Sequence, residues 1–211
     1  MSNIKNTDLF LDIPYELEPL FSEHQYPWQM LPHIKELLEG LTETGIKGYT
    51  RYKNNILIGE GARISDRATL IGPLIIGKGA EIRAGALIRG AVYIGEGCVV
   101  GNSSEIKCSV LLRGAQIPHY NYVGNSILGT LSHLGAGAVI SNLRLDKANV
   151  KIKLSTPIQT GQRKVGAFIG DGCEIGCGSV ICPGSVLGRE CFVHPLTLVN
   201  GVYPERSVLK K

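Results

Sequence analysis

The stretch IGKGAEIRAGALIRGAVYI, residues 76–94, decides the fold of this 211-residue chain. Within it an isoleucine returns at every sixth position. The spacing extends in both directions through aliphatic residues only: Ile58, Ile64, Leu70, Ile76, Ile82, Ile88, Ile94, Val100, Ile106 and Leu112. The series breaks at Pro118, returns as Leu128, Leu134 and Ile140, and resumes as Ile169, Ile175, Ile181, Leu187, Val193 and Val199. A fixed internal period of this length predicts a stacked repeat architecture.

The remaining positions of each unit indicate how it turns. Glycine often follows the aliphatic residue, as at Gly77 and Gly95, and a small residue such as Ala80 comes four positions after it. Glycine suits turns that demand a positive φ. Three units close one triangular coil, and the coils stack about 4.8 Å apart. We therefore predict a prism of parallel strands, with Cys98, Cys173 and Cys191 at small inward positions.

Composition excludes several classes of function. The net charge of +4 is too small for a nucleic-acid binder, and no basic run alters that. No apolar stretch approaches the roughly 18 residues of a membrane span, and the residues that follow Met1 lack the apolar core of a signal peptide. We expect a cytoplasmic protein with reduced cysteines, without a membrane partner. The six cysteines never form Cys-x-x-Cys, so no metal site is predicted.

The prism is expected to occupy part of the chain. Residues 1–55 do not follow the six-residue period, and they carry an apolar stripe at helical spacing that ends near Gly40. This predicts a capping segment with one helix over the first coil. Residues 56–201 form the prism, and residues 202–211 a C-terminal tail. Residues 142–166 interrupt the period and should project as a loop, with basic side chains suited to phosphates.

Chemistry-bearing side chains gather near the first break. His119 lies where the regular repeat becomes irregular, which is an unusual place for a core residue. Glu105 and Lys107 precede it on a neighbouring coil, and a shortened coil would let Glu105 and His119 approach.

These residues stand in three motifs: Gly-Asn-x-x-Glu-Ile-Lys (101–107), His-x-x-Tyr-x-Gly (119–124) and Gly-Ala-Gly-x-x-x-x-Asn (135–142). The chain thereby resembles the hexapeptide-repeat acyltransferases. It is most similar to the acetyltransferase half of bifunctional sugar-1-phosphate nucleotidylyltransferase/acetyltransferases, with an archaeal-type continuation from Asn142 to Gly166. The resemblance implies an all-β fold, a left-handed parallel β-helix, although the general crossover rule favours the right-handed form.

The resemblance also implies acetyl-CoA as donor and an amino-sugar 1-phosphate as acceptor. His119 matches the general base, and an imidazole that titrates near neutrality suits that role. Glu105 orients it or binds the sugar. Arg89 and Lys107 match phosphate-binding residues, while the sugar site is matched by Tyr122, His133, Asn142 and Lys151. Ala136, Cys177, Arg163 and Lys164 are the candidates for binding acetyl-CoA.

Alternatives remain open at this point. His133, Leu143 and Cys177 depart from the bacterial pattern, so the acceptor is a different or nucleotide-linked amino sugar in one alternative. A non-catalytic scaffold or regulatory subunit is another, and a γ-type carbonic anhydrase a third, although the histidine spacing disfavours it. We expect a homotrimer. Residues 1–55 hold no glycine-rich nucleotidyl-transfer loop, so a separate nucleotidylyltransferase is a possible partner.

Overall fold

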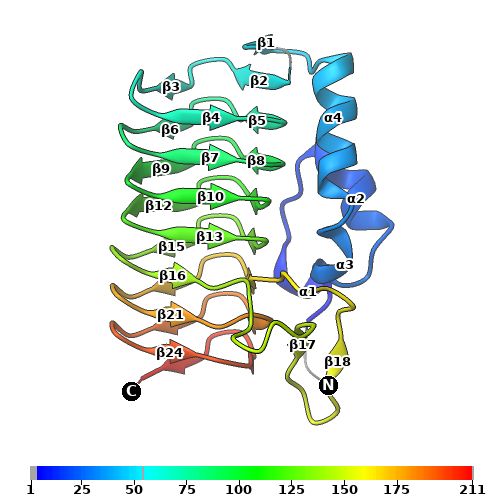
Figure 1. Cartoon of the computed structure of the whole chain (residues 1–211), viewed down its shortest axis with the longest axis vertical. Helices are drawn as coiled ribbons and strands as arrows, with labels where there is room; N and C mark the ends of the chain where they lie inside the picture. The colour runs from blue at the N-terminus through cyan, green and yellow to red at the C-terminus, as the bar shows by residue number, and fades with distance from the viewer. Residues whose placement is uncertain (1–3, 54, 211) are drawn as a thin grey trace.

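A computed structural model describes residues 4–53 and 55–210; Met1, with which the segment tested for a signal peptide begins, lies outside them. Short strands follow one another around a three-sided prism (Figure 1). Its predicted architecture, an all-β left-handed parallel β-helix of six-residue repeats, is confirmed. Sheet 1 contains β1 (Tyr49–Arg51), β2 (Ile56–Gly59), β5 (Leu74–Ile76), β8 (Val92–Ile94), β11 (Val110–Leu111), β14 (Ile127–Leu128), β19 (Ala167–Ile169), β22 (Ser185–Leu187) and β25 (Val202–Tyr203).

The chain passes from sheet 1 to sheet 2 and then to sheet 3 in each coil. Sheet 2 contains β3 (Arg63–Ile64), β6 (Glu81–Ile82), β9 (Val99–Asn102), β12 (Gln116–His119), β15 (His133–Leu134), β20 (Glu174–Ile175), β23 (Phe192–Val193) and β26 (Val208–Leu209). Sheet 3 contains β4 (Thr69–Ile71), β7 (Leu87–Arg89), β10 (Glu105–Lys107), β13 (Tyr122–Gly124), β16 (Val139–Ile140), β21 (Val180–Ile181) and β24 (Leu198–Val199). We name the edges between them corner 1–2, corner 2–3 and corner 3–1.

Aliphatic side chains fill the prism, and they follow the six-residue series for most of its length. Ile82, Ile88 and Ile94 are buried in the same core, and Cys98, Cys173 and Cys191 lie there too. Their burial contributes on the order of 1.5–3 kcal/mol for each large aliphatic side chain. Close-packed columns of small and medium residues explain why so few aromatic rings are needed.

The register slips by one residue at corner 3–1. Ile76 pairs with Ile94, 18 positions on, but Ile94 pairs with Leu111, 17 positions on. Lys107 is still 18 positions from its partner Arg89, so the residue is lost at Cys108-Ser109, where Cys108 has φ 47°. The predicted break at Pro118 is therefore wrong in position.

The slip changes which side chains point inward. Leu111 and Ile117 lie in the prism core, whereas Leu112 belongs to the apolar cluster outside it. Coils of 17 residues then continue as far as Ile140, which pairs with Val123.

A helical layer covers the outer surface of sheet 1 (Figure 1). It consists of α1 (Asn6–Leu9), the 3₁₀ helix η1 (Tyr15–Leu17), α2 (Glu18–Ser22), α3 (Pro27–Met30) and α4 (Ile34–Thr44). The prediction of one helix is wrong. Helix α4 continues through Gly40, where nothing lies within 4 Å of an added Cβ, and stops at Gly45, whose φ is +86°. Packing of buried Leu38 offsets the roughly 1 kcal/mol that an interior glycine costs.

The predicted place of this segment is wrong for its helices, which cover a face, whereas β1 pairs with β2 at the end of the first coil. The physical reason lies in sheet 1, whose outward side chains are large and apolar in successive coils, including Leu57, Ile75, Ile127 and Phe168. Exposed together they would form a large apolar patch, so they require a cover.

Two further boundaries differ from the prediction. The predicted C-terminal tail, residues 202–211, is wrong for the described residues 202–210, since β25 and β26 add strands to sheets 1 and 2. The segment 142–166 leaves the prism at corner 3–1 and forms an antiparallel hairpin of β17 (Lys151–Ile152) and β18 (Ile158–Gln159). It packs on the helical layer as well as projecting (Figure 1), because Gln162 Nε2 donates to the Trp28 carbonyl at 2.7 Å.

Within the described ranges, none of the helices is long and apolar enough to cross a bilayer. The predicted cytoplasmic location stays a prediction.

Candidate active site

Corner 2–3 aligns His119, Ala136 and Cys177 on successive coils. At each coil one residue adopts a left-handed conformation, and its N–H donates to the carbonyl of the coil before. Tyr120 N donates to Asn102 O at 2.9 Å, Gly137 N to His119 O at 3.0 Å, and Gly178 N to Ala136 O at 2.9 Å. Coils in such a stack are about 4.8 Å apart, so Ala136 and Cys177 follow His119 along one edge.

The His119 side chain is exposed on this edge. In the part of the chain that the structure describes, its imidazole makes no hydrogen bond or ion pair. Both ring nitrogens are therefore accessible to a bound molecule, as a general base requires.

Buried Asn121, which sequence reasoning missed, fixes the backbone around His119. Its Oδ1 accepts the His119 N–H at 3.0 Å, and its Nδ2 donates to the carbonyls of Gly135 at 2.8 Å and Ala138 at 3.1 Å. Its own N–H donates to Ser104 Oγ at 3.2 Å. The signal available in the sequence is an amide residue directly after a left-handed turn position, a place where asparagine side chains bond to nearby backbone.

Gly101 permits the close approach that sets His119 on the stack. A Cβ at Gly101 would overlap the Pro118 carbonyl oxygen. The glycine of the Gly-Asn-x-x-Glu-Ile-Lys motif is thus explained by backbone contact with the histidine strand.

Backbone donors lie beside His119 on the same edge. Across residues 4–53 and 55–210, the amides of Ala136 and Cys177 donate no hydrogen bond, and both residues are exposed. Small side chains at these positions leave the corner open to an extended molecule. Backbone amides without an internal acceptor are the kind of donor that stabilises a developing oxyanion.

A second polar group lies on sheet 3. Glu105 and Tyr122 begin their strands next to corner 2–3, whereas Arg89 and Lys107 end theirs next to corner 3–1. Glu105 pairs in register with Tyr122 on one side and Leu87 on the other, while Lys107 pairs with Arg89. Alternate residues of a strand share a face, so Arg89, Glu105, Lys107 and Tyr122 all point outward. Arg89 Nε lies 2.7 Å from Glu105 Oε1, with both side chains partly exposed.

Tyr122 and Asn142 also lie together. A Cβ on Gly124 would lie 2.6 Å from Asn142 Nδ2 and 2.7 Å from Tyr122 Oη, so glycine leaves room for both groups. Asn142 Nδ2 donates to Asn125 Oδ1 at 2.7 Å. Burial and then the Glu105 charge raise the pKa of Tyr122, which keeps its hydroxyl protonated.

Two roles were predicted for Glu105, and one of them, orienting His119, would require Glu105 to contact the imidazole. In the structure its partner is a different residue. His119 pairs in register with Asn102, which puts Glu105 around the corner from it on the adjacent coil. Glu105 binds Arg89 and not His119. Its position therefore agrees with a role at the sugar end.

The other predicted residues lie elsewhere in the chain. His133 is on sheet 2 with His119 but pairs with Glu174, Nδ1 to Oε2, at 2.8 Å. Lys151 belongs to the hairpin, where its backbone contacts Gly184 several coils from Arg89. Arg163 Nε donates to the Lys147 carbonyl, and Lys164 forms an isolated antiparallel β-bridge with Leu143. Both residues therefore lie in the segment that leaves at corner 3–1. Within one copy of the chain, Arg163 and Lys164 therefore lie at a different corner from Ala136 and Cys177.

Three or more metal-ligating side chains do not gather anywhere in the described residues.

Fold and site define an acyltransferase of the hexapeptide-repeat class, and sequence comparison agrees. Residues 166–201 match the bacterial transferase hexapeptide family (six repeats), and residues 70–163 match the GMPPB C-terminal domain. The putative acetyltransferase YaiX of Escherichia coli (strain K12) is 32% identical over 84% of this chain and 84% of its own length. The chain therefore belongs to the hexapeptide-repeat acyltransferases.

More specific relatives are bifunctional proteins. The sugar-1-phosphate nucleotidylyltransferase/acetyltransferase of Sulfurisphaera tokodaii is 33% identical over 88% of this chain and 47% of the relative. The GlmU protein of Methanocaldococcus jannaschii is 34% identical over 82% and 43%, respectively. The chain spans about half the length of these relatives and matches their acetyltransferase part.

Similarity to solved structures is weaker. The acetyltransferase domain of PglB from Neisseria gonorrhoeae FA1090 gives a TM-score of 0.40 with 17% identity, over 84% of this chain and 62% of that chain. This degree of similarity does not bear on the function.

Proposed function

We propose that the protein transfers the acetyl group of acetyl-CoA to the amine of an amino-sugar 1-phosphate. One observation carries the proposal: His119, whose imidazole has no partner among the described residues, lies on the same edge as the free amides of Ala136 and Cys177. The cations of sheet 3 lie on the two preceding coils, at the other end of their strands. Base, oxyanion donors and phosphate-binding side chains are the three parts that such a reaction needs. Similarity to the bifunctional sugar-1-phosphate nucleotidylyltransferase/acetyltransferase of Sulfurisphaera tokodaii supports the same reaction.

His119 acts as the general base in this proposal. The sugar amine attacks the thioester carbonyl, forming a C–N bond, and His119 takes the proton that the nitrogen loses. The C–S bond then breaks, and His119 returns the proton to the departing thiolate. The Ala136 N–H stabilises the oxyanion formed between these events.

The sugar end is assigned to sheet 3. Arg89 and Lys107 hold the phosphate, with the planar guanidinium giving paired contacts. Glu105 keeps that guanidinium in place through the 2.7 Å ion pair. Tyr122 and Asn142 contact the sugar hydroxyls as hydrogen-bond partners.

A second copy completes the site in this proposal. Arg163, Lys164 and Lys151 leave the prism at corner 3–1, so they reach the Ala136–Cys177 edge of an adjacent copy rather than of their own. A homotrimer places one such edge at each of three equivalent clefts. A separate nucleotidylyltransferase that would use the product stays a prediction.

The test measures thiol release from acetyl-CoA over a panel of amino sugars, amino-sugar 1-phosphates and nucleotide-linked amino sugars. His119→Ala should lower kcat by roughly 10²–10⁴-fold. His194→Ala is the matched control, because His194 is an exposed histidine that follows a strand of the same sheet. Equal losses in the two variants would contradict the assignment of the base.

A second variant addresses the acceptor. Arg89→Lys should raise KM for the sugar phosphate about tenfold with a smaller change in kcat, because an ammonium cannot give the paired contact. Arg83→Lys is its control, since Arg83 also pairs with a glutamate, Glu81, but on sheet 2. A preference for nucleotide-linked sugars would replace the proposed acceptor, and a silent panel would favour the scaffold.

A further inference from the structure

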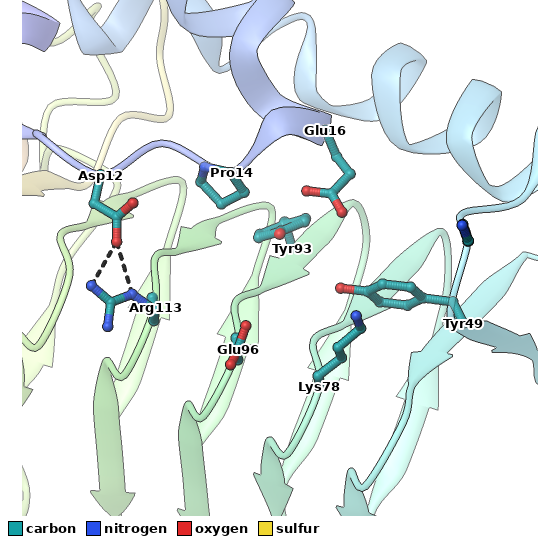
Figure 2. Close-up of a pocket in the computed structure, with 9 residues that line it drawn as sticks. Asp12, Pro14, Glu16, Tyr49, Lys78, Tyr93, Glu96 and Arg113 are labelled. Atoms are coloured by element: carbon teal, nitrogen blue, oxygen red, sulfur yellow. Dashed lines mark hydrogen bonds and ion pairs between the residues drawn. The ribbon is translucent and has the colours of Figure 1, made fainter.

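A cavity of about 220 Å³ lies at corner 1–2, beneath the N-terminal segment (Figure 2). It is lined by Asp12, Pro14, Glu16, Lys47, Tyr49, Lys78, Tyr93, Glu96 and Arg113. This volume far exceeds the roughly 10–15 Å³ that one water requires. It is below the roughly 300–1,000 Å³ of drug-sized pockets, which limits an occupant to a small metabolite.

The floor of the cavity is a column of alternating charge. Lys78, Glu96 and Arg113 occupy the same corner position on consecutive coils, since Gly97 N donates to Lys78 O at 2.9 Å and Gly114 N to Glu96 O at 2.8 Å. Neighbouring charges in the column are therefore about 4.8 Å apart along the prism.

Only part of this charge is neutralised within the protein. Arg113 pairs with Asp12, Nη2 to Oδ2, at 2.7 Å. Among the described residues, Glu16, Glu96, Lys47 and Lys78 form no ion pair. Two carboxylates and two ammonium groups thus face the same small space, with no net charge.

Glu16 belongs to η1 and stands apart from the charges of the column (Figure 2). The carboxylate of Glu16 points toward the Tyr93 ring, and Tyr49 extends from the side (Figure 2). Tyr93 is 2% exposed, so the Glu16 carboxylate lies against a buried aromatic ring. Burial first, and then the negative charges of Glu16 and Glu96, raise the pKa of Tyr49 to about 12, so its hydroxyl stays protonated beside these carboxylates. A carboxylate beside two tyrosine rings suits an ammonium group, which also gains from the ring faces.

Lys78 supplies the opposite end. Its ammonium lies under Tyr49 in Figure 2, and a Cβ on Gly48 would lie 3.4 Å from Lys78 Nζ. Lys47 lines the same side of the cavity. Two cations without carboxylate partners are suited to an acidic group.

We propose that this cavity binds a small zwitterion, with its primary amine at Glu16 and its carboxylate or phosphate at Lys78. Glu16 comes from the N-terminal segment and Lys78 from the prism, so the two ends of such a molecule would contact different parts of the protein. The site lies on corner 1–2, whereas His119 is on corner 2–3, so the proposal stands independently of the acetyl transfer. Its occupant would link the N-terminal segment to the prism.

Calorimetric titration of the full chain tests the proposal, with β-alanine and glucosamine 1-phosphate as the two zwitterions. Methylamine and inorganic phosphate serve as probes for each half alone. At least one zwitterion should bind with Kd on the order of 1 mM, and each half at least tenfold more weakly. Binding should weaken with added salt, since exposed charges are screened.

Variants locate the binding. Glu16→Gln and Lys78→Met should each weaken it about tenfold or more, whereas Glu36→Gln and Lys35→Met on α4 should leave it unchanged. Circular dichroism confirms that the variants fold. Glucosamine 1-phosphate is also the proposed acceptor, so only the binding event lost in Glu16→Gln belongs to this cavity. Absence of saturable binding by both zwitterions, or binding insensitive to Glu16→Gln and Lys78→Met, would overturn the proposal.

Discussion

Asn121 shows how much of the candidate site depends on a residue that touches no substrate in our proposal. It is 3% exposed and holds four hydrogen bonds that join three consecutive coils at the His119 corner. Its amide side chain supplies both donor and acceptor in one plane, which no aliphatic residue of similar size can do. We therefore regard it as the positioning residue for His119.

Asn121→Ala should destabilise the fold by about 1–3 kcal/mol, because it leaves buried backbone groups without partners. It should also lower kcat with little change in KM, since the imidazole loses its fixed backbone. Urea unfolding and steady-state kinetics measure the two effects. Asn102→Ala is the control, because it removes two exposed hydrogen bonds, one donated to the Ala84 carbonyl and one accepted from the Ser103 hydroxyl. Unchanged kcat in a folded Asn121→Ala protein would contradict the positioning role.

Tyr49 gives a prediction about alkaline stability. Its folded-state pKa is about 12, above the ordinary value near 10, so the unfolded chain loses this proton first as the pH rises. The stabilisation is complete below pH 10 and is lost between about pH 10 and 12. Burial also raises the pKa of Tyr93, which changes the stability in the same direction.

The free energy of unfolding should thus fall over that pH range, and less steeply in Tyr49→Phe. Chemical unfolding at a series of pH values measures the slope. Tyr15→Phe is the control, because Tyr15 is 83% exposed. A slope equal in Tyr49→Phe and the parent protein would refute the assignment.

Among the elements, the repeat was predictable and its exceptions were not. Ile76, Ile82 and Ile88 indicate the inward positions, because each short strand needs one buried aliphatic side chain. The slip at Cys108-Ser109 could not be predicted, because Cys108 adopts the same left-handed conformation as Gly90 one coil earlier and no residue marks the corner as one residue shorter. Leu112 then looks like a core residue of the prism, although it packs outside it.

The sequence does contain a pattern that indicates the helical layer. Every third strand carries a large apolar residue at its outward position, as Leu57, Ile75 and Phe168 show. Two faces with mixed outward residues and one with apolar residues indicate a covered face. The site motifs were identified by their resemblance to a known family and stay a prediction. The separation of Glu105 and His119 could not be predicted, because it depends on which side of a corner each residue occupies.

Asp171 ties the N-terminal segment to the prism, and its loss should loosen that segment selectively. Its Oδ2 accepts the Leu11 N–H and its Oδ1 the Thr130 N–H, both at 2.8 Å. Asp171→Ala should cost about 1–3 kcal/mol and speed amide exchange at Leu11 and its neighbours.

Hydrogen-exchange mass spectrometry reports the effect, and Asp171→Asn, which keeps one acceptor oxygen, should be intermediate. Glu190→Gln is the control: its pair with Arg206 is exposed, so exchange should stay as in the parent. Uniformly faster exchange throughout the prism would mean that Asp171 supports the whole fold rather than the segment.

For the whole molecule, the covered face restricts how copies can associate. Sheet 1 is occupied by the helical layer, which leaves sheets 2 and 3 for contact with other copies. Exposed apolar side chains lie on sheet 3 and along corner 2–3: Ile71, Tyr120, Val180, Leu196 and Leu198. The proposed catalytic edge lies within this apolar strip, so association and catalysis should depend on the same surface.

Val180→Lys combined with Leu198→Lys places two charges on that strip, at outward positions paired in register. Burying them without partners is costly, so the double variant should convert the expected trimer to monomers and abolish acetyl transfer. Light scattering after size exclusion gives the mass, and circular dichroism checks the fold. Tyr15→Lys, on the helical layer, should remain trimeric and active. A parent protein that is monomeric yet active would show that one chain suffices, and the basic residues Arg163 and Lys164 would then have no part in binding the donor.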